Sequence, residues 1–198
     1  MLNFTESNMA ESEQRRWYAV DDGVMGGVSQ SGFRVDAGAG CFGGEVSLEN
    51  GGGFASVRRE PNGFEPTLAH GQGIVLRVRG DGRTYQLRLK SSALDEASAY
   101  RVAFTPTAHQ WETHQFTWAQ FEAVRRGTLL SSAPPLDPHT IHQLGFLIAD
   151  RTAGPFRLEV ASIASHSQAD TYRVDSYSTK VVSYVVCRSR NLESPLST

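Results

Sequence analysis

The sequence predicts an all-β fold, an antiparallel β-sandwich or jelly roll. Three observations carry this prediction. Apolar residues recur at every second position in several runs, Gly and Pro residues punctuate those runs, and sustained helical periodicity is scarce. Many short strands separated by turns are typical of sandwiches and jelly rolls.

The clearest alternation falls on two runs that flank Asp81-Gly82. Apolar residues take alternate positions in both runs: Ile74, Leu76, Val78, Tyr85, Leu87 and Leu89. Because Asp and Gly both tolerate the positive φ of a tight turn, we expect the two runs to pair as a hairpin. Their apolar side chains should face the core, together with Tyr100, Val102 and Phe104.

Six further strands are expected from the same pattern. They are Gly43–Leu48, Gly53–Arg59, Tyr100–Phe104, Glu112–Trp118, Leu144–Ala149 and Phe156–Ile163. The spacing of Trp118, Phe121 and Val124 predicts one short helix over Trp118–Arg126, and Asp137-Pro138 predicts a helical turn that begins near His139.

Length and composition favour one large domain. With 198 residues, 39% of them hydrophobic, the chain can bury a core without a disulfide or a metal. We expect this domain to span residues 1–165. Residues 166–198, rich in Ser, Thr and Tyr, should form a C-terminal extension of unknown role. Its apolar patch, Val181–Val186, is either an edge strand or an appended segment.

Charge and cysteine usage exclude several classes of protein. The net charge of −2 and the pI near 6.3 give no basic footprint, so we expect no nucleic-acid partner. The two cysteines, Cys41 and Cys187, form no CxxC pair, which is typical of a reducing compartment. We see neither a signal peptide nor an apolar run of about 18 residues, so we expect a cytoplasmic protein that does not span a membrane.

Four stretches carry a resemblance to a known family. They are WYAVDDGVMGGVS at 17–29, FGGEVSLENGGGFASV at 42–57, LGFLIAD at 144–150 and GPFRLEV at 154–160. Together they resemble the thirty-kilodalton complex I intermediate-associated protein family over roughly Trp17 to Ile163. The resemblance implies a galactose-binding-like β-sandwich, similar in shape to carbohydrate-binding modules, with no metal site. Mitochondrial members of this family are assembly factors for respiratory complex I.

The first stretch contains a glycine-rich loop with paired carboxylates. Its candidate residues are Asp21, Asp22, Gly23, Met25, Gly26, Gly27 and Ser29. Backbone N–H groups in such a loop can hold an anion, and two carboxylates can hold a cation. We favour the structural alternative, because Gly supplies unusual backbone conformations and Asp caps turns.

No constellation of residues recommends an enzyme. His109, His114, His139 and His142 lack a Cys or a third His at zinc-binding spacing, so we expect no metal site. Ser29 misses the last position of the G-x-S-x-G elbow, and no P-loop or strand-linked G-x-G-x-x-G occurs. We therefore expect no catalytic residues and no cofactor.

The polar side of the alternating strands predicts a cationic sheet face. It would present Arg77, Arg79, Gln86, Arg88, Lys90 and Arg101. We expect Arg77, Arg88 and Arg101 to lie within reach of one ligand, because guanidinium groups bind carboxylate, phosphate or sugar hydroxyls. The alternative is a solvated face balanced by acids such as Glu112 and Glu159.

Two functions remain open. The first is a non-catalytic binding or assembly module that holds a protein partner through this polar face or through its loops. The second is a carbohydrate-binding module that holds a small sugar on the concave sheet face. Trp111 is the tryptophan expected to be exposed for stacking on a sugar ring.

Overall fold

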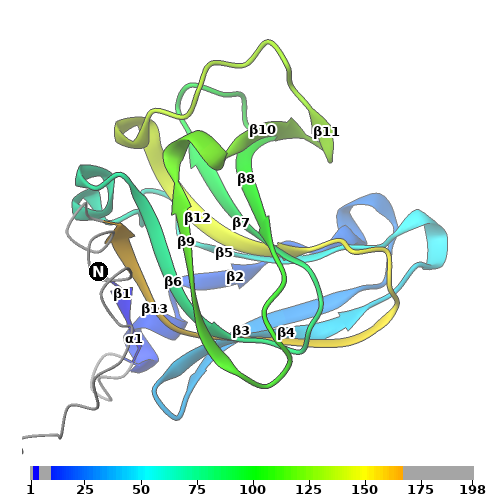
Figure 1. The fold of residues 1–198 in the computed structure, drawn as a ribbon. Helices are drawn as coiled ribbons and strands as arrows, with labels where there is room; N and C mark the ends of the chain where they lie inside the picture. Colours follow the sequence, from blue (N-terminus) through cyan, green and yellow to red (C-terminus); the bar gives the residue numbers. More distant parts are fainter. Residues whose placement is uncertain (1, 5–9, 167–198) are drawn as a thin grey trace, which may run out of the picture. The chain divides into compact units, whose positions relative to one another are not determined.

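Two antiparallel sheets make up most of the structure, a computed structural model that describes residues 2–4 and 10–166 (Figure 1). Sheet A has the order β3-β4-β13-β6-β9, with β1 paired to β13. Its strands are β1 (Leu2–Asn3), β3 (Gln30–Asp36), β4 (Ala39–Val46), β6 (Gly73–Arg79), β9 (Trp111–Thr117) and β13 (Gly154–His166).

Sheet B has the order β11-β10-β8-β7-β12-β5-β2. Its strands are β2 (Trp17–Ala19), β5 (Ala55–Arg59), β7 (Tyr85–Ser91), β8 (Ser98–Phe104), β10 (Glu122–Arg125), β11 (Thr128–Leu129) and β12 (Ile141–Ile148). The helices are short: α1 (Ala10–Gln14), η2 (Asp22–Met25), η3 (Glu49–Gly51), η4 (Pro66–His70), η5 (Trp118–Gln120) and η6 (Pro138–Thr140). The predicted all-β antiparallel sandwich is confirmed.

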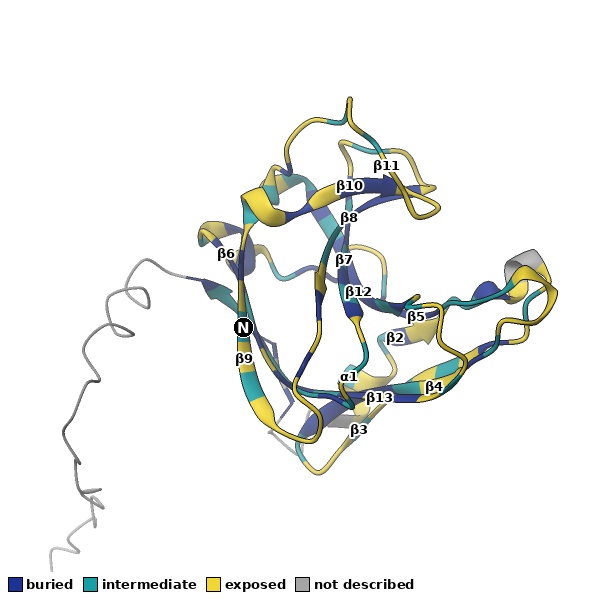
Figure 2. Ribbon diagram, turned by 45° about the vertical axis from the view of Figure 1, so that its right-hand side comes forward, coloured by how far each residue is buried: buried dark blue, intermediate teal, exposed yellow. Residues whose placement is uncertain are grey.

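Alternation along the strands places the core between the two sheets. The six apolar residues predicted on the runs beside Asp81-Gly82 are all fully buried, and Tyr100 and Phe104 are buried with them. Burial differs between central and edge strands (Figure 2). β7 alternates between buried and intermediate residues, whereas β9, at the edge of sheet A, is mostly exposed or intermediate. Val102 is half-buried against the same core.

The predicted Asp81-Gly82 hairpin is wrong. β6 pairs with β13 and β9 in sheet A, whereas β7 pairs with β8 and β12 in sheet B. The chain does turn at this point, since Gly82 has φ of +88° and the Asp81 carboxylate accepts a hydrogen bond from the Arg83 N–H at 3.0 Å. The turn carries the chain from one sheet to the other. Both runs bury apolar residues in either arrangement, so alternation alone does not distinguish them.

The helix predicted over Trp118–Arg126 is wrong beyond its first turn. Thr117 and Gln120 form a capping box around η5, after which residues 122–125 form β10. β10 pairs with β8, which overrides the short helical pattern. The turn predicted near His139 is confirmed as η6, where the Asp137 carboxylate accepts a hydrogen bond from the His139 N–H at 3.0 Å.

The other predicted strands correspond to β4, β5, β8, β9, β12 and β13, with shifted ends. β13 continues to His166, one residue past the predicted domain end. The patch at 181–186 lies outside the described residues, and the division of the chain at 165 stays a prediction. No helix within the described residues has the length and apolar character needed to cross a lipid bilayer.

Candidate functional site

The Asp22 carboxylate is the centre of the glycine-rich loop. It is fully buried and accepts hydrogen bonds from Ser29 N–H at 3.0 Å, Ser29 Oγ at 2.5 Å, Gly53 N–H at 2.7 Å and Phe54 N–H at 3.3 Å. Burial alone would raise the pKa of Asp22, but these hydrogen bonds outweigh it and hold the pKa below its ordinary value. The carboxylate therefore ties the loop at 22–29 to the segment that leads into β5.

Two glycines are required by the close approach of the backbone to this carboxylate. A Cβ on Gly27 would lie 2.4 Å from Asp22 Cγ, and a Cβ on Gly52 would lie 2.6 Å from Asp22 Oδ2. Gly23, in contrast, has open space around its Cα. The combination of Asp22 with glycines from two distant stretches thus has a packing reason.

The neighbouring Asp21 makes a second tie. Its carboxylate accepts hydrogen bonds from Ser31 N–H at 2.8 Å, Ser31 Oγ at 2.6 Å and Ser56 N–H at 2.9 Å. Gly26 closes η2 in the left-handed conformation with φ of 89°. Because the partners of both carboxylates come from this chain, the geometry favours the structural interpretation of Asp21, Asp22, Gly23, Gly26, Gly27 and Ser29. The backbone of Met25 forms the last residue of η2.

The predicted convergence of Arg77, Arg88 and Arg101 is wrong. Arg77 lies on β6 in sheet A, whereas Arg88 and Arg101 lie on β7 and β8 in sheet B. All three point away from the core, since their neighbours along each strand are buried or, for Val102, half-buried against the core. The two sheets turn opposite faces to solvent, so the predicted cationic face is divided between them. The error follows directly from the predicted hairpin, which placed β6 beside β7.

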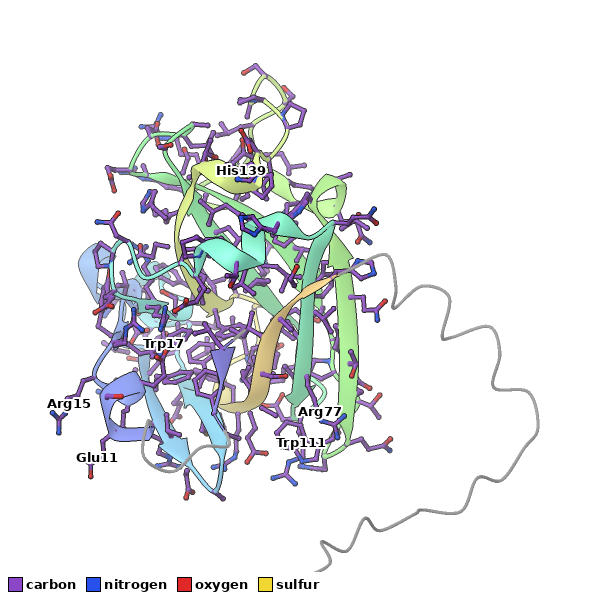
Figure 3. All side chains as sticks on the ribbon, turned by 90° about the vertical axis from the view of Figure 1, so that its left-hand side faces the viewer. Glu11, Arg15, Trp17, Arg77, Trp111 and His139 are labelled. Atoms are coloured by element: carbon purple, nitrogen blue, oxygen red, sulfur yellow. The ribbon has the colours of Figure 1, made fainter. Side chains whose placement is uncertain are left out.

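Sheet A carries Arg77 and Trp111, which lie at the same end of β6 and β9 (Figure 3). Here one carboxylate is shared by two of the cations. Glu159 binds Arg79 at 2.5 Å and Arg157 at 2.9 Å, and the guanidinium of Arg79 also lies 5.1 Å from the centroid of the Trp111 ring. Trp111 is 37% exposed, as expected, but one cation already occupies its vicinity.

Two surface hollows are associated with sheet A. One of about 370 Å³ is formed by β3, β4 and β13, and a second of about 320 Å³ lies beside Arg79 and Arg157. Arg79 and Arg157 at these hollows share the carboxylate of Glu159, and Arg34 also lines the first hollow. Size alone therefore does not make either hollow the better site for a charged ligand.

Sheet B carries a cross-strand row of polar side chains on four of five neighbouring strands, with a glycine on the fifth. In cross-strand register, Arg101 on β8 pairs with Arg88 on β7, Arg88 with Gly145 on β12, and Gly145 with Arg58 on β5. The row ends at Tyr18 on β2, which pairs with Arg58. We call Arg58, Arg88 and Arg101 the arginine row, and the outward side of sheet B that carries it the arginine face.

The arginine row has little compensating charge. Arg101 lies 3.7 Å from the exposed Glu122, and Arg88 donates to the Gln86 side-chain oxygen at 3.2 Å. Within the part of the chain that the structure describes, neither Arg58 nor Arg88 forms an ion pair with a carboxylate. Burial, together with the charges of Arg101 and Arg58, lowers the pKa of Arg88 to about 10.

Lys90 lies beside this row on β7 and is held by the chain itself. Its ammonium donates to the backbone carbonyl oxygens of Glu96 and Ser98, the latter at 3.0 Å. Burial and the charges of Arg58 and Arg88 lower its pKa, although Glu96 acts in the opposite direction. Lys90 thus adds positive charge to the face while its donors are partly occupied.

Two residues of this face, Tyr18 and Arg58, are not among those expected from the sequence. Tyr18 is 41% exposed, and its hydroxyl accepts a hydrogen bond from Gln143 Nε2 at 2.9 Å. Arg58 belongs to a strand that the sequence does predict, and the alternation of buried Val57 with Arg58 is the signal that would have placed it outward. Of the expected set, only Gln86, Arg88, Lys90 and Arg101 lie on this face.

The histidines make local contacts. His114 Nε2 lies 2.6 Å from Glu112, and the rings of His70 and His139 lie 6.4 Å apart. Cys41 is buried, and burial raises the pKa of its thiol. Among the described residues no group of three His, Cys, Asp or Glu side chains is placed to hold a metal ion.

Two antiparallel sheets packed in this way define a galactose-binding-like β-sandwich domain. The model of the family "Complex I intermediate-associated protein 30 (CIA30)" matches residues 2–160, and the chain belongs to this family. The mitochondrial Complex I intermediate-associated protein 30 of Mus musculus is 25% identical over 73% of this chain and 50% of its own length. The protein of that name from Neurospora crassa is 24% identical over 64% of this chain and 47% of its own length. The chain therefore spans about half the length of these curated relatives.

Similar solved structures support the fold. The family 11 carbohydrate-binding module of a cellulosomal cellulase of Clostridium thermocellum matches with a TM-score of 0.53 and 14% identity, over 84% of this chain and 95% of the module. An agarase matches with a TM-score of 0.52 and 10% identity, over 83% of this chain and 26% of the agarase. At these identities the likeness concerns the fold alone.

Proposed function

We propose that this chain is a non-catalytic binding module that serves the assembly of respiratory complex I by holding a protein partner on its arginine face. Membership in the CIA30 family supports an assembly-related role. The cytoplasm is proposed as its location on cysteine usage alone.

The observation that carries the choice of face is the arginine row. On sheet A, Glu159 pairs with both Arg79 and Arg157, and Arg77 stands without an arginine beside it in register. Sheet B places three guanidinium groups in one cross-strand row, and two of them, Arg58 and Arg88, lack a carboxylate partner among the described residues. Placing like charges on adjacent strands is unfavourable, so a structural role does not explain it. The loop motif, in contrast, is accounted for by its own hydrogen bonds.

A pair of blocking variants tests the choice of face. Ala103 lies exposed on the arginine face, opposite Gln86, and Thr113 lies exposed on the outer face of sheet A, opposite Arg77. Immobilised wild-type chain, Ala103→Trp and Thr113→Trp would each be incubated with extract from the native host. We expect complex I subunits or their assembly intermediates on the wild type and on Thr113→Trp, and at least tenfold less on Ala103→Trp. Equal recovery on all three proteins would refute the proposed face.

A carbohydrate ligand on the same face is the second candidate. Tyr18 favours it, because its ring is exposed at the end of the row and its hydroxyl is fixed by Gln143. Titration with a neutral β-glucan oligosaccharide tests it. Saturable binding in isothermal titration calorimetry that Tyr18→Ala abolishes would support a carbohydrate ligand. No binding heat at millimolar oligosaccharide would exclude it.

A further inference from the structure

Arg58 and Arg88 of the arginine row differ from the arginines that tie the sandwich together. Within the described residues, Arg34 and Arg77 on sheet A likewise form no ion pair, but they do not adjoin another arginine in register. Arg59, which is fully buried, meets Glu13 through two hydrogen bonds of 2.6 and 2.8 Å. Arg83 meets Asp150 at 2.7 and 2.9 Å. This chain thus supplies a carboxylate where an arginine has a structural task, and within the described residues it supplies none to Arg58 or Arg88.

Gly145 at the centre of the row brings Arg58 and Arg88 close to each other. It lies in register between them and carries no side chain, and the stem of Arg58 lies against it, since a Cβ on Gly145 would be 3.3 Å from Arg58 Cγ. Each guanidinium carries five N–H donors in a planar fork that fits a carboxylate. Gln86 accepts from Arg88 at 3.2 Å and leaves most donors of that side chain available.

The surroundings of the row favour a peptide over a nucleic acid. Three arginines and Lys90 form a local cluster on a chain whose net charge is −2, without the extended basic surface that a phosphate backbone requires. Half-buried Leu147 and exposed Ala103 lie in the next rows of the same face and provide apolar contact beside the charges.

We propose that the arginine row binds carboxylate groups, so that the segment held on the arginine face is an acidic peptide of the partner. This inference rests on the proposed function, because it names the chemistry of the same face. A carboxylate above Gly145 would be shared between Arg88 and Arg58, and the like charges of the row would then be neutralised by the ligand.

Titration of the full chain with a capped hexaglutamate peptide tests this, with capped hexaglutamine as the uncharged control. In low-salt buffer we expect saturable binding of hexaglutamate alone, weakened at least tenfold in Arg88→Gln and in Arg58→Gln. Arg77→Gln removes an exposed arginine from the opposite sheet and should change the affinity less than twofold. Thermal melts of each variant confirm that it is folded.

Three outcomes would overturn the inference: equal binding by wild type and both row variants, equal loss in Arg77→Gln, or binding of inorganic phosphate or galacturonate oligomers with none of hexaglutamate. The proposed function fails separately. If Ala103→Trp loses the complex I partner while Arg88→Gln retains it, the face stands and its acidic ligand does not. If hexaglutamate binds but Ala103→Trp retains the partner, the anion site stands and the proposed face does not.

Discussion

Replacing Arg88 by Met should stabilise the free protein. Burial and the neighbouring cations lower its pKa to about 10, and at about 1.36 kcal/mol per pKa unit this lowering corresponds to roughly 3 kcal/mol of unfavourable interaction as an upper limit. The substitution also removes the hydrogen bond to Gln86, worth about 1 kcal/mol. We therefore expect Arg88→Met to raise the free energy of unfolding by about 1–2 kcal/mol, or Tm by about 2–6 °C.

Urea and thermal unfolding measure this change directly. Because the folded pKa is depressed, the penalty is complete at every pH below about 10 and is relieved only as the pH rises through that value. The gain should thus be the same at pH 6 and pH 8. Arg77→Met should change stability by less than about 0.5 kcal/mol, whereas Arg83→Met should destabilise because it leaves Asp150 unpaired. A loss above about 1 kcal/mol in Arg88→Met would refute the reasoning, since it would show that Arg88 supports the fold.

Three further predictions concern the residues that hold the sandwich together, and each uses urea unfolding. Gly27→Ala should lower the free energy of unfolding by about 2–4 kcal/mol, because the new Cβ would meet the Asp22 carboxylate. Gly23→Ala, where the new Cβ has open space, should lower it by less than about 1 kcal/mol, and equal losses in the two variants would contradict a packing role for Gly27. Glu13→Gln should cost about 2–4 kcal/mol, because it removes the nearer of the two carboxylates that pair with buried Arg59 and leaves only Glu65 at 3.6 Å; a cost below about 1 kcal/mol would count against it. Because the pKa of Asp22 is lowered in the folded state, its ionised carboxylate contributes to the free energy of unfolding above about pH 4, and this contribution is lost as the pH falls further. Acid should therefore destabilise the wild type more steeply than Asp22→Asn. Parallel plots of unfolding free energy against pH would contradict this.

The sequence was sufficient for the layers of the fold but not for the pairing of strands. Alternation at Ile74–Val78 and Tyr85–Leu89 correctly separates buried from outward positions, because the inner face of either sheet has to be apolar. Which strand lies beside β6 depends on β13, about 80 residues away, and no local pattern encodes it. The same limit explains the helix predicted after Trp118, where pairing of β10 with β8 outweighs a short helical periodicity.

In the candidate site, too, the sequence predicts what depends on a single strand and not what depends on strand order. Arg88 and Arg101 were placed outward correctly, because that depends only on their own strands. Arg58 was missed and Arg77 was wrongly grouped with them, because both assignments require the strand order. The role of Asp22 was favoured as structural on residue type, but its contact with Gly53, 31 residues later, is visible only in three dimensions.

Photo-crosslinking tests the central claim, that the arginine face is the surface that holds the partner, most directly. A photoreactive benzoylphenylalanine would replace Ala103 on the arginine face or Thr113 on sheet A, and each chain would be irradiated with extract from the native host. We expect a complex I protein cross-linked to position 103, with an acidic peptide at the site of attachment, and none at position 113. Cross-links to the partner from position 113 and not from position 103 would contradict it.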